Sequence, residues 1–262
     1  MKILILGAGK MGSFLCDLLS QEHDVAIIDR DRQRLLFTFG CRRFESLDEV
    51  DDFKPDMVIN AVTVKYTLDV FRQVLPHLPK RCILSDIASV KTGLPEFYAG
   101  AGHPFVSTHP MFGPTFASLS HLSNENAIII REGDHLGRVF FRDLYSRLGL
   151  HIEEYTFAEH DHTIAYSLSI PFASTLAFAG VMKHQDAPGT TFKRHLDIAR
   201  GLMSEDDYLL SEILFNPHTS GQLEAIIGRL EELKDIIDNH DSDRMKVFLD
   251  TVRANLRSGS GN

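Results

Sequence analysis

The feature that most constrains this chain is a glycine-rich turn directly after a short apolar segment near the N-terminus. Ile3–Leu6 are followed by Gly7-Ala8-Gly9-Lys10-Met11-Gly12. In this spacing the first glycine permits a tight turn, the second lets a pyrophosphate approach, and the third allows close helix packing. A helix that begins here offers amides and partial positive charge to phosphates. The motif predicts a dinucleotide site at Gly7, Gly9, Lys10, Met11 and Gly12, with a ligand-free turn as the alternative.

Short segments rich in Ile and Val recur through the first 150 residues, and helical patterns at residues 11–21 and 66–75 separate some of them. Such an alternation is typical of a parallel sheet with helices on both faces. We expect an α/β Rossmann-type dinucleotide-binding domain over residues 1–155. Its predicted strands are residues 2–6, 24–29, 57–61, 82–86, 105–108 and 127–131.

Strand patterns stop near residue 155, and helical patterns follow. Residues 157–184 are mostly apolar and contain Pro171, which predicts a buried helix kinked or broken at the proline. An apolar stripe of period 3.6 predicts a second helix that begins near Asn216–Pro217, and a third is expected over 243–256. We expect an all-α C-terminal dimerisation domain at 156–257 and a flexible tail at 258–262.

Composition excludes several classes of protein. The hydrophobic fraction is 44% and the net charge is −9, which argues against disorder and against binding to nucleic acid or anionic membranes. The 3 cysteines follow no paired spacing, so neither a disulfide framework nor a metal site is expected. No unbroken apolar run approaches the roughly 20 residues that span a bilayer, and the first run is too short for a secretion signal. We expect a cytoplasmic protein.

Residues at the ends of the predicted strands bear on the choice of cofactor. Asp29 ends the second strand, where a carboxylate accepts hydrogen bonds from the ribose hydroxyls of NAD. Arg30 next to it could receive the extra phosphate of NADP or lie in solvent, so NAD is favoured and NADP is the alternative. Ala61 ends the third predicted strand and Val62 follows it at the same edge, and both are assigned to the cofactor as well.

Two polar segments follow neighbouring predicted strands. One is Ser85-Asp86-Ile87-Ala88-Ser89-Val90-Lys91, and the other is Thr108-His109-Pro110-Met111-Phe112-Gly113-Pro114. The carboxyl ends of parallel strands share one edge, so Ser89 and His109 are expected beside the reactive end of the cofactor. A neutral histidine accepts a proton at cellular pH. Ser89 can hydrogen-bond the substrate or cap a helix over residues 90–97, and Lys91 is expected to be structural or exposed to solvent.

These segments resemble the prephenate/arogenate dehydrogenases of tyrosine biosynthesis. The resemblance rests on the turn at Gly7–Gly12, on Ser89-Val90-Lys91, on the block from His109 to Pro114 and on Glu159-His160-Asp161. It implies an NAD-dependent oxidative decarboxylation of prephenate to 4-hydroxyphenylpyruvate, in which His109 takes the hydroxyl proton and Ser89 assists. It also implies a homodimer formed through the helical half.

The chain departs from the family pattern on its long helix. Family members carry histidines where this chain has Ser169 and Phe172, so Ser169 is the remaining candidate for a substrate contact. The family also clamps a substrate carboxylate with an arginine. The candidates for this role are Lys193, Arg194 and Arg200, of which Lys193 and Arg194 are assigned to it. No acid stands between Pro114 and Glu125 to bind the ammonium of arogenate, which favours prephenate.

Two other readings remain open. The β-hydroxyacid dehydrogenases share the glycine turn and a helical second domain, but they use a lysine on the long helix, and residues 160–182 contain none. A dinucleotide-sensing regulator could use the same first domain without any turnover. Such a protein would not need a histidine beside the reactive end of the cofactor.

Overall fold

The computed structural model describes residues 1–112, 122–123 and 125–259. The chain divides into two compact units. The first, here called the sheet unit, comprises Met1–Thr163 and Asp206–Glu212, and the second, the helical unit, comprises Ile164–Glu205 and Ile213–Asn262. The sequence analysis places its boundary between residues 155 and 156, so the helix at 157–164 falls on the other side of this division.

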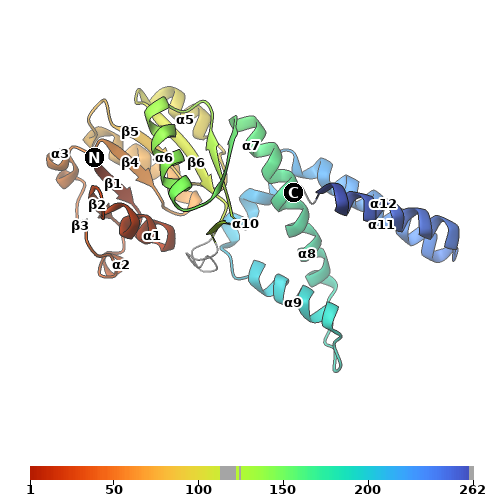
Figure 1. Cartoon of the computed structure of the whole chain (residues 1–262). Coiled ribbons are helices and arrows are strands. Elements are labelled where there is room, and N and C mark those ends of the chain that lie inside the picture. The colour runs from red at the N-terminus through yellow and green to blue at the C-terminus, as the bar shows by residue number, and fades with distance from the viewer. Residues whose placement is uncertain (113–121, 124, 260–262) are drawn as a thin grey trace. The chain divides into compact units, whose positions relative to one another are not determined.

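An eight-stranded sheet forms the centre of the sheet unit, with the order β3-β2-β1-β4-β5-β6-β7-β8 (Figure 1). Neighbouring strands run parallel from β3 to β6 and again between β7 and β8, whereas β6 and β7 pair antiparallel. The strands are β1 (Lys2–Leu6), β2 (Asp24–Ile28), β3 (Arg42–Phe44), β4 (Met57–Asn60), β5 (Ile83–Asp86), β6 (Phe105–Pro110), β7 (Asn126–Ile130) and β8 (His151–Tyr155).

Helices cover both faces of this sheet because its strands are apolar on both sides. One face packs against α1 (Lys10–Leu19) and α6 (His135–Arg147). The other face packs against α3 (Asp48–Phe53), α4 (Thr67–Val74), α5 (Leu94–Ala101) and the start of α7 (Phe157–Ile164). The short helices α2 (Arg32–Leu35), η1 (Val64–Tyr66) and η2 (Leu75–His77) lie in the connections. The predicted Rossmann-type α/β domain followed by helices is therefore confirmed.

The sheet differs from the expected one in three details. The sequence analysis did not predict β3, a three-residue strand with two arginines, or β8, whose residues are partly exposed. The structure also pairs β7 antiparallel to β6, with His109 opposite Ile128. This pairing extends β6 two residues beyond the predicted end at 108. Exposed edge strands lack the apolar run by which buried strands are recognised.

The long apolar helix expected over residues 157–184 is present as the helical stretch Phe157–Val181. The prediction that it is buried is wrong within this chain, because none of the residues Ile170–Val181 is buried, and a π-helical turn before Pro171 takes the place of a break. After α7 the chain forms a π-helical turn, η4 (Ala165–Ser169), and continues as α8 (Ile170–Val181). A proline has no N–H for the carbonyl four residues earlier, and a wide turn accommodates that loss. The sequence analysis missed α9 (Thr190–Leu202) and α10 (Asp207–Leu214). The helix α12 (Ser242–Gly259) continues into residues 258 and 259, where a flexible tail was expected.

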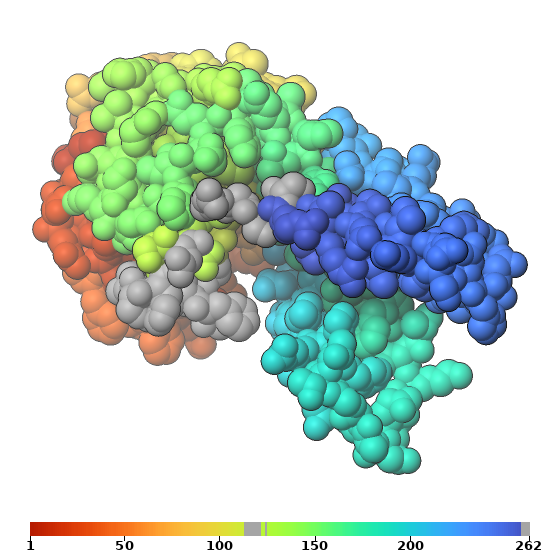
Figure 2. Space-filling model, turned by 45° about the vertical axis from the view of Figure 1, so that its right-hand side comes forward, coloured from red at the N-terminus to blue at the C-terminus, as the bar shows by residue number. Residues whose placement is uncertain are grey.

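The predicted apolar stripe lies on α11 (Thr219–Asp238), which packs beside α12 and α8 (Figures 1 and 2). Within the chain only part of this stripe is covered. Ile236 is 1% exposed, whereas Ile227, Leu230 and Ile237 are all more than half exposed. The helical unit thus presents an apolar surface that its own helices do not cover.

One helical stretch among the described residues, Phe157–Val181, is long and apolar enough to cross a membrane by length and composition alone. Its most apolar window has a mean hydropathy of 1.5, and 17% of that window is buried. The sequence analysis looked for an unbroken apolar run and found none, because small polar residues such as Ser174 and Thr175 interrupt this stretch. The absence of a membrane partner therefore stays a prediction.

Candidate active site

The glycine turn has the geometry that each of its three glycines requires. Gly7 has a φ of +96°, which L side chains rarely adopt. A Cβ on Gly12 would lie 1.8 Å from the carbonyl oxygen of Gly7, so the helix can pass the turn only without a side chain. At Gly9, by contrast, a Cβ would meet no heavy atom of the described chain within 4 Å. The open side of the turn is therefore the side that a pyrophosphate would approach.

The first turn of α1 is suited to an anion. Its N-cap is Gly9 in an extended conformation, and among the described residues no side chain caps the helix and no acid lies in its first turn. Helix amides at an uncapped N-terminus attract phosphate oxygens. The predicted residues Lys10 and Met11 are the first two residues of this helix, Lys10 exposed and Met11 half-buried.

Asp29 lies directly beyond the end of β2, and its carboxylate accepts hydrogen bonds from two backbone amides. Its Oδ2 accepts a hydrogen bond of 2.6 Å from the Ala8 amide, and its Oδ1 accepts one of 2.8 Å from the Asp31 amide. Each carboxylate oxygen has a second lone pair. The contact with Ala8 links this carboxylate directly to the glycine turn, as the predicted role in binding a ribose requires.

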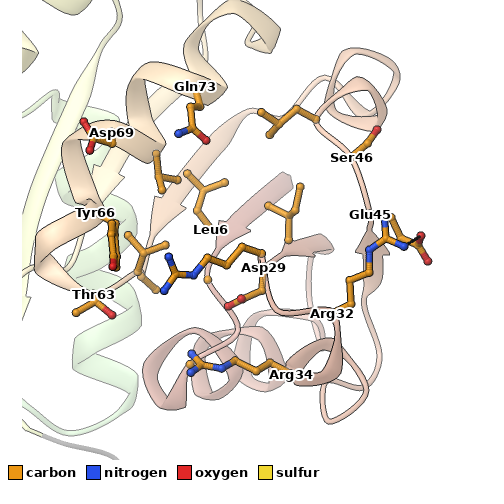
Figure 3. A pocket seen from close by; sticks show the side chains of 18 residues that line it. Leu6, Asp29, Arg32, Arg34, Glu45, Ser46, Thr63, Tyr66, Asp69 and Gln73 are labelled. Carbon is orange, nitrogen blue, oxygen red and sulfur yellow. Dashed lines mark ion pairs between the residues drawn. The ribbon is translucent and has the colours of Figure 1, made fainter. Parts of the chain in front are cut away.

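A cavity of 740 Å³ adjoins the turn and is lined by Gly7, Gly9, Asp29, Arg30, Ala61 and Val62 among others. This volume is in the usual range for small-molecule sites. In Figure 3, Asp29 lies between Tyr66 on one wall and Arg32 with Glu45 on the other. The structure thus brings most of the predicted cofactor residues to one cavity.

The arginines of this cavity have different partners. The guanidinium of Arg30 lies 4.5 Å from the centre of the Tyr66 ring, a cation–π geometry. Arg32 forms a 2.8 Å ion pair with Glu45, and Arg34 approaches Asp31 at 3.5 Å. All three are therefore engaged by neighbouring side chains.

The strand register places the predicted catalytic residue at the same edge of the sheet. Leu6, Asn60, Asp86 and Ser107 pair in one row across β1, β4, β5 and β6. The glycine turn begins one residue beyond this row, and His109 lies two residues beyond it. Three strand spacings of about 4.8 Å separate β1 from β6, which is about 14 Å. An extended dinucleotide can span such a distance.

A buried ion pair lies between this edge and α5. The Lys91 ammonium is 2.6 Å from the Asp86 carboxylate, and both side chains are fully buried. Lys91 also donates to the Thr108 carbonyl at 2.8 Å, and the Tyr98 hydroxyl donates to Asp86 at 2.7 Å. Burial lowers the pKa of Lys91, and the neighbouring carboxylate opposes that shift. Of the two alternatives predicted for Lys91, the structure supports the structural role and contradicts exposure to solvent.

Ser89 lies in the connection between β5 and α5 and is half-buried. The prediction that it could cap a helix over 90–97 is wrong, because α5 begins at Leu94 with Gly93 at its N-cap. Gly93 is the last residue of this connection, and its φ of +74° is a conformation that favours glycine. The role of Ser89 toward a substrate or cofactor stays a prediction.

His109 lies within β6 and is 6% exposed. Its Nδ1 is 3.1 Å from Nε2 of His160 on α7, and Nδ1 of His160 is 3.1 Å from Oδ1 of Asp161. Burial holds the pKa of His109 well below its usual range, and nearby His160 and Lys91 lower it further. Burial also lowers the pKa of His160. Both imidazoles are therefore neutral at physiological pH, which is the form that accepts protons.

The remaining predicted substrate contacts belong to the helical unit. Ser169 is buried, and its hydroxyl donates to the Ile213 carbonyl at 3.0 Å and accepts from the Thr219 hydroxyl at 2.9 Å. It thus joins helices, rather than bonding within its own helix. Lys193 and Arg194 are exposed on α9. The substrate roles of all three stay predictions, and Gly113 and Pro114 of the His109 motif lie outside the described residues.

Sequence reasoning did not assign a role to His160, Asp161 or Asp86. The first two were noticed only as part of a motif, because the contact between His109 and His160 joins residues 51 positions apart. Asp86 was visible as a polar residue at the end of an otherwise apolar strand. A carboxylate there needs a cation, and the lysine five residues later is the one it finds.

Several known proteins are similar to this chain in sequence and in fold. The family profile described as "Prephenate dehydrogenase, nucleotide-binding domain" matches residues 20–134. The probable arogenate/prephenate dehydrogenase of Methanocaldococcus jannaschii is 25% identical over 203 residues, which cover 72% of this chain and 45% of that protein. Arogenate dehydrogenase 1, chloroplastic, of Arabidopsis thaliana is 26% identical and covers 89% of this chain and 39% of its own length. The chain thus spans less than half the length of these curated relatives.

Solved structures share the fold over nearly the whole chain. Prephenate dehydrogenase of A. aeolicus, crystallised with hydroxyphenyl propionate and NAD⁺, superposes with a TM-score of 0.83 at 18% identity and covers 98% of both chains. Synechocystis arogenate dehydrogenase gives a TM-score of 0.74 at 18% identity, with 98% of this chain and 99% of that chain covered. Residues 20–134 of this chain are thus similar in sequence to the nucleotide-binding domain of prephenate dehydrogenases, and nearly the whole chain shares the fold of these two solved dehydrogenases.

Proposed function

We propose that this chain is an NAD-dependent prephenate dehydrogenase, which converts prephenate to 4-hydroxyphenylpyruvate and CO₂. The observation that carries the proposal is a buried, neutral histidine at the carboxyl edge of the sheet that also holds the glycine turn. A protein that only senses a dinucleotide has no use for a proton acceptor there. A β-hydroxyacid dehydrogenase would need a lysine on the long helix, which residues 160–182 do not contain.

The residues of the cavity fit NAD as the cofactor. The open side of Gly9 and the uncapped start of α1 suit a pyrophosphate, and the carboxylate of Asp29 suits two ribose hydroxyls. A carboxylate at that position repels the extra phosphate of NADP, and Arg30 is already stacked on Tyr66. When bound, NAD accepts a hydride from the substrate carbon. The A. aeolicus structure that shares this fold contains NAD⁺.

His109 would move one proton during this reaction. Its unprotonated ring nitrogen takes the proton of the ring hydroxyl as the same carbon loses its hydride and becomes a carbonyl carbon. The ring carboxylate then leaves as CO₂, and its bonding electrons make the ring aromatic. His109 returns the proton to the same oxygen, which becomes the phenol, so no net proton is consumed. Aromatisation supplies the driving force, and the chain supplies orientation and the base.

Prephenate rather than arogenate is the substrate we propose. The two differ by a keto group in place of an ammonium group on the side chain. An ammonium needs a carboxylate partner when it is bound, and no acid stands between Pro114 and Glu125. Lys193 and Arg194 on α9 are the proposed partners of the substrate carboxylates, with Ser89 and Ser169 as proposed hydroxyl contacts.

The test is NADH formation, followed by absorbance, with prephenate and arogenate in parallel and with NAD⁺ and NADP⁺ in turn. We expect turnover with prephenate and NAD⁺, and a loss of about 100-fold or more in His109→Asn. His151→Asn, which changes an exposed histidine on β8, is the matched control and should keep full activity. Equal or faster turnover of arogenate would overturn the substrate assignment, and no turnover of either would overturn the reaction.

We also propose that the chain forms a homodimer through its helical unit. The helical unit has a large apolar surface that its own helices leave exposed. It includes Ile227, Leu230 and Ile237 on α11 and much of the helical stretch Phe157–Val181. Surfaces of this kind mark association sites on proteins. A second copy can cover this surface without placing the His160–Asp161 end of the stretch in lipid.

Light scattering after gel filtration tests the dimer, and flotation with anionic vesicles tests a membrane. We expect a dimer at micromolar concentration that Leu230→Glu converts to a monomer. Leu136→Glu, which changes another exposed leucine, on α6 of the sheet unit, is the control and should stay dimeric. A wild-type protein that is monomeric would contradict the proposed dimer. A protein that floats with the vesicles would contradict the predicted cytoplasmic location.

A further inference from the structure

His109 is the inner end of a chain of three side chains. Its neighbour His160 is 0% exposed, and the two ring centres lie 5.3 Å apart with an interplanar angle of 60°. Both links of the chain, from His109 Nδ1 to His160 Nε2 and from His160 Nδ1 to Asp161 Oδ1, measure 3.1 Å. Asp161 is at the outer end, with its side chain 34% exposed.

The proton positions in this chain follow from the outer end inward. An ionised carboxylate only accepts hydrogen bonds, so Nδ1 of His160 must carry a proton toward Asp161. In a neutral His160, Nε2 then has a lone pair and must accept. Nδ1 of His109 must therefore donate to it, and the remaining nitrogen of His109, Nε2, is left unprotonated. Within the described ranges, no hydrogen-bond partner occupies that nitrogen.

The charges around the two rings favour this arrangement. Lys91, in the segment between β5 and α5, lowers the pKa of both histidines, while Asp161 on α7 and Asp86 on β5 raise that of His160. Burial is the largest influence on each and lowers both values. A protonated His160 would instead donate from Nε2, which would place the proton of a neutral His109 on the nitrogen that has to act as the base.

We propose that His160, anchored by Asp161, is a positioning residue that fixes the tautomer of His109 and leaves Nε2 as the atom that accepts the hydroxyl proton. This inference rests on the proposed function, since it explains how the proposed base is made ready before substrate binds. His160 itself touches neither substrate nor cofactor in this account. Its contribution is the choice of nitrogen and the angle of the His109 ring.

Nitrogen-15 NMR of the histidine-labelled protein, without substrate or nucleotide, is the direct test. Long-range couplings distinguish the two neutral tautomers of each ring. We expect both His109 and His160 to carry the proton on Nδ1. We expect His160→Phe, which cannot accept a hydrogen bond, to give His109 a mixture of tautomers. An unchanged His109 signal in a folded His160→Phe protein would overturn the proposal.

A second variant keeps the test valid if His160→Phe does not fold. Asp161→Asn replaces the carboxylate, which only accepts hydrogen bonds, by an amide that can also donate one. Either tautomer of His160 is then allowed, and both tautomers of His109 should appear. Asp143→Asn, an exposed carboxylate on α6, is the matched control for the lost charge. A single, unchanged tautomer in Asp161→Asn would contradict the role of the carboxylate.

Kinetics supply the readout that a purely structural role would not change. We expect kcat to fall about 10- to 100-fold in His160→Phe with the Kd for NAD⁺ unchanged, and His160→Gln, which can accept through its amide oxygen, to recover part of the loss. The acid limb of the pH profile should also move to higher pH in His160→Phe, because a neighbour that lowers the pKa of His109 is gone. The NMR result stands even if the protein turns over no prephenate, so failure of the two proposals can be told apart.

Discussion

The sheet unit and the helical unit bury their apolar residues to very different extents. In the sheet unit, every residue from Ile3 to Leu6 on β1 is at most 1% exposed, and both faces of the sheet are covered by helices. In the helical unit, α8 has no buried residue, and α11 buries only Thr219 and Ile236. The first unit has a core of its own, whereas the second leaves much of its apolar surface uncovered. We therefore expect substitutions to report on folding in one unit and on association in the other.

The largest effect is expected at the buried ion pair of the sheet unit. Lys91→Met leaves the Asp86 carboxylate buried without its cation, which costs about 3–5 kcal/mol of unfolding free energy. Unfolding in urea measures this loss of unfolding free energy. Lys80→Met, an exposed lysine before β5, should cost less than about 0.5 kcal/mol. The double variant Lys91→Met/Asp86→Asn should recover part of the loss, and an equal loss in the double variant would show that the charge is not the cause.

Adjacent residues of α11 sharpen the comparison within the helical unit. Ile236 is 1% exposed and Ile237 is 54% exposed. Ile236→Ala should lower the unfolding free energy by about 2–4 kcal/mol, because it leaves a cavity inside the unit. Ile237→Ala should leave the unfolding of the dilute monomer within about 1 kcal/mol of wild type and weaken the dimer instead. Circular dichroism and light scattering separate these outcomes, and equal effects on folding would break the comparison.

Two glycines of the turn separate folding from ligand binding in the sheet unit. Gly12→Ala places a Cβ 1.8 Å from the Gly7 carbonyl oxygen. The turn and α1 must shift, at a cost of about 1–3 kcal/mol. At Gly9 the space is open, so Gly9→Ala should unfold like wild type and lose only affinity for the dinucleotide. Thermal unfolding and calorimetric titration with NAD⁺ test the pair, and full affinity in Gly9→Ala would place the pyrophosphate elsewhere.

The smallest expected effect is a pH dependence of stability in the sheet unit. The folded chain lowers the pKa of His109 and His160, so below about pH 6.5 the unfolded chain binds more protons than the folded one. The two neutral histidines therefore make their full contribution to the unfolding free energy above about pH 6.5, and this contribution is lost as the pH falls. We expect His109→Asn to lose less stability than wild type between about pH 8 and pH 5. An identical loss in both proteins would mean that His109 is not held neutral by the fold.

The sequence predicted the parts of the molecule that depend on short-range patterns. The glycine turn, Asp29 and six of the eight strands follow from a motif or from an apolar run, so local order was enough. The pairing of β7 against β6 and the exposed strand β8 could not be predicted, because strand direction depends on contacts between distant residues. Of the two alternatives for Ser89, the helix cap was wrong, since Gly93 is the N-cap of α5.

The residues of the candidate site can be proposed one by one from the sequence, but the contacts between them cannot. His109 was found because a motif and the end of a strand coincide there. Its partner His160 and the buried state of Lys91 depend on how α7 and the segment before α5 fold onto the sheet. Nothing in the local pattern shows that a lysine after a Ser-Val pair is fully enclosed. Such residues become visible only when the burial of each side chain is known.

The ion pair of Asp86 and Lys91 also constrains how this sequence can change over evolutionary time. Either residue replaced alone leaves one buried charge without its counter-charge, whereas replacing both by apolar residues of similar volume can be nearly neutral. Tyr98 adds a third position to this constraint, because its hydroxyl donates to the same carboxylate. Among descendants of this chain we therefore expect positions 86 and 91 to be kept together or exchanged together, with single replacements rare even where the surrounding sequence drifts freely.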